Sequence, residues 1–377
     1  MTIKAAVVMT TIGDPALLDG YFENFHANGR LAQARVIVIP DRKTPNAAYE
    51  RCALLAKKGL PVICPTLDDQ ECFLRKLGLP SDFIPYDSDN RRNIGYLIAL
   101  EGECDFIISI DDDNWAPTRG DFFGEHAVVC AEMHDFRIVE ASGGWFNLCS
   151  LLKMEPEIET YPRGFPYFAR HEKVRVSARV AAATVRINGG LWTQHPDLDA
   201  MSWLNAPVKA VAFRGTSFVL DRATWAPINS QNTAVHRSVI PSYYFLRMGA
   251  TVAGMKIDRY GDIFSGYFSQ ACARALGHSV RVGSPIATHA RNSHNYLRDA
   301  TQEMACVCVL EDLLPWLHEV GLQGEDYAEM YCSLAEQMEC AVEKFSGFIW
   351  NDEIRTFFHE SAGMMRKWVE VCRTIGI

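Results

Sequence analysis

Three consecutive aspartates, Asp111, Asp112 and Asp113, directly follow a short apolar run in this 377-residue chain. Carboxylates so close together repel one another at neutral pH, so their clustering favours a bound cation. Alternate side chains of an extended strand share a face, which predicts that Asp111 and Asp113 converge while Asp112 points toward other polar groups. Hard oxygen ligands of this kind suit Mg²⁺ or Mn²⁺, which commonly bridge protein to substrate phosphates.

Two other uses of an acidic triplet are weaker. One side chain is enough to cap a helix, and the two carboxylates of an acid/base pair usually come from different segments. The chain has no GxxxxGK[ST] loop, no GxGxxG after its first apolar run and no EF-hand spacing. A metal without a phosphate-binding loop indicates a diphosphate held mainly by the cation, which is the chemistry of nucleotide-sugar enzymes.

The overall composition is that of an ordinary globular protein, with 48% hydrophobic and 22% charged residues. The formal net charge of −9 gives no basic face, so a general nucleic-acid binder is not expected. The apolar stretch near the start is too short for a secretory signal, and no run of apolar residues is long enough for a transmembrane segment. We therefore expect a cytoplasmic enzyme or binding protein.

Apolar runs and amphipathic segments alternate along the first third of the chain. Strands are expected at 4–12, 34–41, 60–66 and 104–113, and helices at 17–30, 46–59 and 91–103. This alternation predicts an α/β fold, a Rossmann-like, mainly parallel sheet with helices on its faces. Ligands of such sheets bind beyond the carboxyl ends of the strands, which is where Thr10, Asp41 and the aspartate triplet fall.

The chain changes character twice after the triplet. Residues 130–298 are richer in aromatic residues and glycine and have less regular periodicity. From Asp299 onward, three amphipathic helical stretches are separated by Gly321 and Gly347. We therefore expect a catalytic domain over residues 1–298 and a C-terminal helical region over 299–377, whose helices pack on the catalytic part or form a homo-oligomer.

Five segments, in order, resemble one known family. The stretch RRNIGYLIALEGECDFIISIDDDNW resembles the part of the reversibly glycosylated polypeptides, the UDP-arabinopyranose mutases, that leads into their Asp-Asp-Asp motif. The other four are YPRGFPYFAR, NGGLWTQHPDLDA, DRYGDIFSGYF and ATHARNS, so the likeness spans roughly residues 90–295. The resemblance implies a glycosyltransferase-A fold and a UDP-sugar as the partner.

The resemblance also implies roles for individual residues near the nucleotide. Asp111 and Asp113 would hold Mn²⁺ or Mg²⁺, with His289 as a nitrogen ligand. The residues expected near the nucleotide are Thr10, Asp41 and Arg92, with Arg92 facing the base or a phosphate.

Arg163 falls on the arginine that carries the sugar in the family. That role is chemically demanding because a guanidinium is almost always protonated and is a poor nucleophile. A bidentate hold on the diphosphate is the plainer role, which arginine suits well, and Arg170 is the other candidate. The residues alone do not decide between the two roles.

Further acids and a tryptophan complete the expected site. Asp262 matches the second acid of an Asp-Asp pair in the family, with Gly261 in place of the first. It would act as a base or stabilise positive charge on the sugar, and we group it with Arg163 and Asp112 as catalytic candidates. Trp192, Asp197 and Asp199 would offer a ring face and hydrogen-bond acceptors to sugar hydroxyls, although a tryptophan buried without a ligand is equally consistent with the sequence.

Three functions are compatible with these residues. The favoured one is a metal-dependent mutase that interconverts pyranose and furanose forms of a UDP-sugar. A glycosyltransferase would use the same donor site, with Asp262 removing the proton of an acceptor hydroxyl. A non-catalytic subunit of such an enzyme is the third, and the joint presence of the triplet, Arg163, Asp262 and His289 argues against it.

Overall fold

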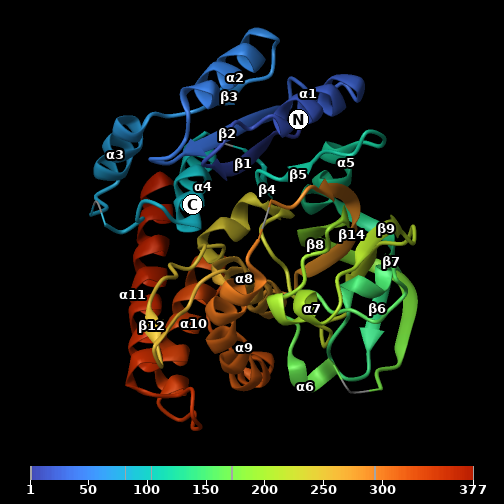
Figure 1. Cartoon of the computed structure of the whole chain (residues 1–377), viewed down its shortest axis with the longest axis vertical. Helices are drawn as coiled ribbons and strands as arrows, with labels where there is room; N and C mark the ends of the chain where they lie inside the picture. The colour runs from blue at the N-terminus through green and yellow to red at the C-terminus, as the bar shows by residue number, and fades with distance from the viewer. Residues whose placement is uncertain (1, 81, 103, 171–172, 293, 377) are drawn as a thin grey trace.

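The computed structural model describes residues 2–80, 82–102, 104–170, 173–292 and 294–376. Four parallel strands come first, in the order β3-β2-β1-β4. The strands are β1 (Ala5–Thr11), β2 (Ala34–Pro40), β3 (Val62–Ile63) and β4 (Phe106–Ile110). The helices between them are α1 (Leu17–Ala27), α2 (Asn46–Lys57), α3 (Leu67–Lys76) and α4 (Arg92–Glu101). Figure 1 shows β1, β2 and β3 with α1 and α2 at one end of the molecule.

The expected strands and helices of this N-terminal part are all present. The exception to the sequence analysis is α3, which was not predicted although its start carries a recognisable signal. The Thr66 side chain accepts a hydrogen bond from the Asp69 backbone N–H at 3.2 Å, and the Asp69 carboxylate accepts one from the Thr66 N–H at 3.0 Å. This reciprocal pair is a capping box, which fixes the first turn of α3.

The sheet continues beyond β4 with mixed pairing. Strand β11 (Asn232–His236) runs antiparallel to β4, and β8 (Val176–Gln194) pairs with both β11 and β14 (Ser279–His289). The remaining strands of this sheet are β5 (Asn114–Trp115), β6 (Glu132–Ala141), β7 (Leu152–Glu155), β9 (Lys209–Phe213) and β10 (Phe218–Leu220). The α/β class is confirmed, and the parallel character belongs chiefly to the first four strands.

The C-terminal helices share one hydrophobic core with the sheet. They are α9 (Tyr296–Glu319), α10 (Tyr327–Val342) and α11 (Asp352–Ile375), and the core that they enter also contains Val8 of β1. The indole N–H of Trp368 in α11 donates to the backbone oxygen of Ile240 at 3.0 Å. Figure 1 shows α11 running along the flank of the molecule toward α4. The helical region therefore packs on the rest of the chain, and self-association through it stays a prediction.

No helix in the described part of the chain is both long enough and apolar enough to cross a membrane.

A buried histidine links the sheet to the short helix α5 (Phe122–His126) and gives a pH-dependent prediction. His126 lies 2.9 Å from the Asn232 side-chain oxygen and 2.9 Å from the Asn188 side-chain nitrogen, so its ring donates to the first and accepts from the second. This arrangement requires the neutral ring, and burial lowers the pKa of His126 from 6.5 to about 3.

The unfolded chain therefore binds this proton below pH 6.5, whereas the folded chain does not until about pH 3. Folding stability contributed by His126 is present above pH 6.5 and is lost as the pH falls toward 3. Linkage gives a loss of about 1 kcal/mol between pH 6.5 and pH 5.5. Urea unfolding of wild type and His126→Gln across this range measures it. Parallel stability curves for the two proteins would contradict the assignment.

Candidate active site

A polar cleft of about 370 Å³ lies at the carboxyl ends of β1, β2 and β4. This is where an open α/β sheet binds its ligands. The lining includes ten residues that the sequence analysis selected, namely Thr10, Asp41, Arg92, Asp111, Asp112, Asp113, Arg163, Asp197, Asp262 and His289. Residues that are far apart in the sequence therefore meet at one site.

The aspartate triplet directs its three carboxylates to three different partners. Strand β4 ends at Ile110, so the triplet lies in a turn and the alternation of an extended strand does not govern it. Asp111 accepts from Arg92, and Asp112 accepts from the Thr11 hydroxyl at 2.8 Å. The Asp113 carboxylate lies 3.3 Å from Nε2 of His289.

Helix α4 fixes Arg92 beneath Asp111. The Arg92 side chain is buried, and its Nη1 donates to the Ser109 hydroxyl at 3.0 Å and to the Ser230 backbone oxygen at 2.9 Å. Gly95 lets α4 approach β1 closely, because a Cβ there would stand 2.3 Å from Cγ1 of Val8. Burial would lower the pKa of Arg92, but Asp111 outweighs it and the pKa is raised. Arg92 therefore stays charged and partly neutralises the triplet.

His289 and Asp113 form the part of the site that suits a metal. Nδ1 of His289 donates to the His195 backbone oxygen at 2.6 Å, which leaves Nε2 facing Asp113. Burial would lower the pKa of His289, but the hydrogen bond with Asp113 outweighs it and raises that pKa. A ring whose Nδ1 is anchored in this way is typical of metal-binding histidine.

The donor set fits Mn²⁺ or Mg²⁺ in chemistry but is not assembled. Among the described residues, no three His, Cys, Asp or Glu side chains lie close enough together to hold an ion. Asp111, which would complete the set, is engaged by Arg92.

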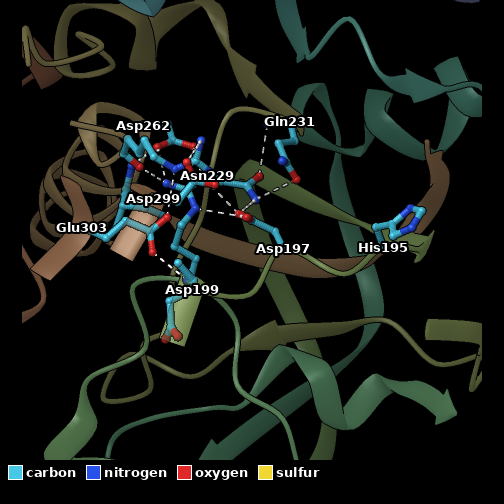
Figure 2. A network of polar contacts seen from close by, with 12 residues as sticks. His195, Asp197, Asp199, Asn229, Gln231, Asp262, Asp299 and Glu303 are labelled. Atoms are coloured by element: carbon cyan, nitrogen blue, oxygen red, sulfur yellow. Dashed lines mark hydrogen bonds and ion pairs between the residues drawn. The ribbon is translucent and has the colours of Figure 1, made fainter. Parts of the chain in front are cut away.

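Arg163 lies at the centre of a buried ionic network. Its Nε and Nη2 donate to the two carboxylate oxygens of Asp197 at 3.0 and 3.1 Å. Its Nη1 and Nη2 donate to those of Asp262 at 3.0 and 2.8 Å, and Nη1 also donates to the Arg259 backbone oxygen. All five N–H groups of the guanidinium are therefore used. Figure 2 shows Asp197 and Asp262 reaching this cluster from different elements.

The charges in this network stabilise one another. Burial alone would lower the pKa of Arg163, but Asp197 and Asp262 outweigh it and raise that pKa well above its usual value. Burial would raise the pKa of Asp197, but Arg163 outweighs it and the pKa is lowered. The side-chain nitrogen of Asn229 adds a hydrogen bond to Asp197 at 2.8 Å. The cleft therefore contains a permanently charged arginine flanked by two carboxylates.

Residues 66–376 match the family described as reversibly glycosylated polypeptide. The chain belongs to this family. It is 26% identical over 308 residues to the probable UDP-arabinopyranose mutase 2 of Solanum tuberosum, covering 78% of this chain and 74% of that protein. It is 25% identical over 299 residues to the UDP-arabinopyranose mutase 3 of Arabidopsis thaliana, covering 78% and 75%.

Among solved structures, a glucosyl-3-phosphoglycerate synthase from Mycobacterium tuberculosis, in complex with Mn²⁺, UDP-glucose and phosphoglyceric acid, has a TM-score of 0.41. It is 11% identical, with 82% of this chain and 79% of that chain covered. The resemblance seen in the sequence is confirmed by the family match, and the chain has the glycosyltransferase-A-like α/β architecture expected of it.

One departure of this reversibly glycosylated polypeptide from the family pattern has a structural basis. Gly261 stands where the family has the first acid of its pair. A Cβ at Gly261 would lie 2.5 Å from the Leu246 backbone oxygen and 2.6 Å from a ring carbon of Phe245. This packing leaves no room for a side chain at that position. Asp197, from another segment, supplies the second carboxylate beside Arg163.

Three of the residues selected from the sequence do not line the cleft in this family member. Asp199 caps α7 (Ala200–Asn205) by accepting from the Ser202 N–H at 2.7 Å, and it pairs with Arg170 at 2.5 Å. Figure 2 shows Asp199 pointing away from Asp197 and Asp262. Trp192 is buried behind the cleft, where it lines a small cavity together with Arg163. A sugar contact for these three residues therefore stays a prediction without a place on the cleft wall.

Several cleft residues were not selected from the sequence. They are Asp89, Ser230, Arg259 and Arg291. Arg259 has a φ of 62°, in the left-handed region that residues with side chains rarely adopt, and its carbonyl contacts Arg163. No local pattern marks Ser230 or Arg291, because only the tertiary fold brings them to the cleft.

Proposed function

We propose that this chain is a nucleotide-sugar mutase that interconverts the pyranose and furanose forms of a UDP-sugar. Membership of the family and the names of the two plant relatives support a UDP-sugar substrate. The observation that carries the proposal is the Arg163 network, in which two carboxylates flank a cation inside the cleft. A simple diphosphate clamp has no need of this arrangement.

The occupied N–H groups of Arg163 favour a role at the sugar. A guanidinium whose five donors already bind two carboxylates and a carbonyl offers no free fork to a diphosphate. Asp262, 2.8 Å from Nη2, is placed to accept the proton that this nitrogen would lose on bonding to the anomeric carbon. The two carboxylates would also stabilise positive charge that develops on the sugar.

In the proposed reaction, the bond between the anomeric carbon and the diphosphate oxygen breaks, and the electron pair leaves with the phosphate. Nη2 of Arg163 bonds to the anomeric carbon and its proton passes to Asp262. The ring oxygen then leaves the anomeric carbon and is protonated, while the 4-hydroxyl loses its proton and closes the five-membered ring. The diphosphate oxygen returns to the anomeric carbon, and Arg163 recovers its proton from Asp262.

Asp113 and His289, joined by Asp111, would hold Mn²⁺ or Mg²⁺. The bound ion would neutralise negative charge on the diphosphate when the anomeric bond breaks. Asp111 would have to share its carboxylate with Arg92, which it contacts now. Asp112 would keep its hydrogen bond to Thr11 and so fix the turn that carries the other two.

The test is an incubation without any acceptor. Purified protein with Mg²⁺ is given UDP-arabinopyranose, and in parallel other UDP-pentoses and UDP-hexoses, and the products are followed by proton NMR. We expect new furanose anomeric signals with the nucleotide sugar intact. Slow release of UDP and free sugar without any furanose would contradict the mutase and support a glycosyltransferase that hydrolyses its donor. Turnover of none of these sugars would support a non-catalytic subunit.

A further inference from the structure

We propose that Arg291 forms the diphosphate-binding subsite of this cleft, as the cation that receives the phosphate oxygens of a nucleoside diphosphate. This inference rests on the proposed function, because it assumes that a nucleotide sugar occupies the cleft. It assigns the diphosphate to a residue other than Arg163 and Arg170.

Arg291 is held rigidly in the cleft wall by two aromatic rings. Its guanidinium carbon lies 5.3 Å from the ring centre of Trp203 in α7 and 5.1 Å from that of Tyr296 at the start of α9. The two rings are themselves stacked, with centres 5.7 Å apart and planes 11° from parallel. Contact with aromatic faces orients a guanidinium without using any of its N–H groups. The donors of Arg291 are thus left for another partner.

Within the described part of the chain, Arg291 has no hydrogen bond. Its side chain is only 5% exposed, and its Nη1 is buried without a partner. The nearest carboxylate is that of Asp299, at 4.0 Å from Nη2, and this group already accepts from His294 at 2.8 Å. A buried cation whose donors are unmet is costly unless an anion pairs with it.

The other buried arginines of the cleft are already engaged. Arg163 uses all its donors, and Arg92 is bound to Asp111, Ser109 and Ser230. Nε of Arg259 donates to Glu303 at 2.9 Å. Arg91 donates to Gln70 and lies over the ring of Tyr86 at 4.0 Å. Among the described cleft arginines, Arg291 is therefore the one prepared for an external anion.

The position of Arg291 in the chain places this subsite beside the residues proposed for the metal. Strand β14 ends at His289, and Arg291 follows two residues later on the same cleft wall. A diphosphate held by an arginine fork on one side can still present oxygens to a cation on the other. The arrangement leaves Arg163 and its two carboxylates free to act on the sugar.

The experiment is isothermal titration calorimetry of the full chain in Mg²⁺ buffer with UDP and, separately, with uridine. We expect Arg291→Gln to weaken UDP binding by about 30-fold, the loss typical of charge-assisted hydrogen bonds, and to leave uridine affinity within about twofold. Arg291→Lys, which keeps the charge but not the fork, should weaken UDP binding by about 10-fold. Arg298, which is exposed on α9 and outside the cleft, provides the charge-matched control Arg298→Gln.

Each outcome bears on one of the two proposals. If wild-type protein does not bind UDP at all, the proposed function fails. If wild type binds UDP and both Arg291 variants bind it within threefold of wild type, the diphosphate subsite is overturned and the proposed function stands. An equal loss of UDP and uridine affinity also overturns the subsite, because the effect would then not lie at the phosphates. Thermal unfolding of each variant establishes that it is folded.

Discussion

Replacing Arg163 with lysine is expected to lower furanose formation by ~10³-fold, while UDP affinity stays within about threefold of wild type. Lysine keeps the positive charge, but its three donors cannot match the two bidentate carboxylate contacts and the carbonyl contact that Arg163 makes. The sugar would therefore lose its partner at the anomeric carbon. UDP would keep its binding site because the diphosphate binds elsewhere. Steady-state kinetics by NMR and calorimetry with UDP measure the two quantities.

A matched control separates chemistry from folding in this experiment. Arg281 is also buried in an ion pair, 2.9 Å from Glu125, but it lies outside the cleft. Arg281→Lys should disturb stability in a similar way and leave turnover per folded molecule near that of wild type. A parallel fall in UDP affinity and turnover in Arg163→Lys would contradict the account and return Arg163 to the role of a diphosphate clamp.

Removal of divalent cations should abolish turnover, and Mn²⁺ or Mg²⁺ should restore it. In His289→Ala, the metal concentration that gives half-maximal activity should rise by about 10- to 100-fold or more, because Asp113 loses its neighbouring nitrogen donor. Asp113→Asn should act in the same direction, since an uncharged amide is a weaker ligand for a hard cation. Activity titrations with each metal after chelation and dialysis measure these changes.

The control for this prediction is a histidine far from the cleft. His359 on α11 contacts only Glu343 among the described residues of the chain and is partly exposed. His359→Ala should therefore leave the metal dependence unchanged. Full activity of wild type in the presence of a strong chelator would show that Asp113 and His289 form an ordinary ion pair and that the reaction proceeds without a metal.

Local sequence signals were sufficient for the N-terminal half of the sheet and for the helical end of the chain. Apolar runs of β-branched residues produced β1, β2 and β4 where they were expected, because these strands are buried on both faces. The long strand β8 was not predicted. Its first residues, from Val176, are exposed on both faces and therefore carry no regular hydrophobic period.

The candidate site was predictable where a residue follows a strand or belongs to a recognised segment. Arg163 and Arg170 lie in the same segment, and the sequence could not choose between them. The fold separates them, because Arg163 meets the first turn of α8 (Gly261–Ala275) at Asp262, whereas Arg170 pairs with Asp199 outside the cleft. Arg291 had no signal of its own, since its aromatic cage comes from α7 and α9.

The most direct test of the mutase is the acceptor-free reaction run with UDP-arabinopyranose that carries ¹⁸O in the bond between the sugar and the diphosphate. If the anomeric bond breaks and re-forms while UDP stays bound, ¹⁸O will move from the bridging to the non-bridging positions of the β-phosphate. Phosphorus NMR detects this movement. We predict that it accompanies furanose formation in wild type and is absent in Arg163→Lys. Furanose that forms while all the ¹⁸O remains in the bridging position would contradict cleavage of that bond and with it the proposed role of Arg163.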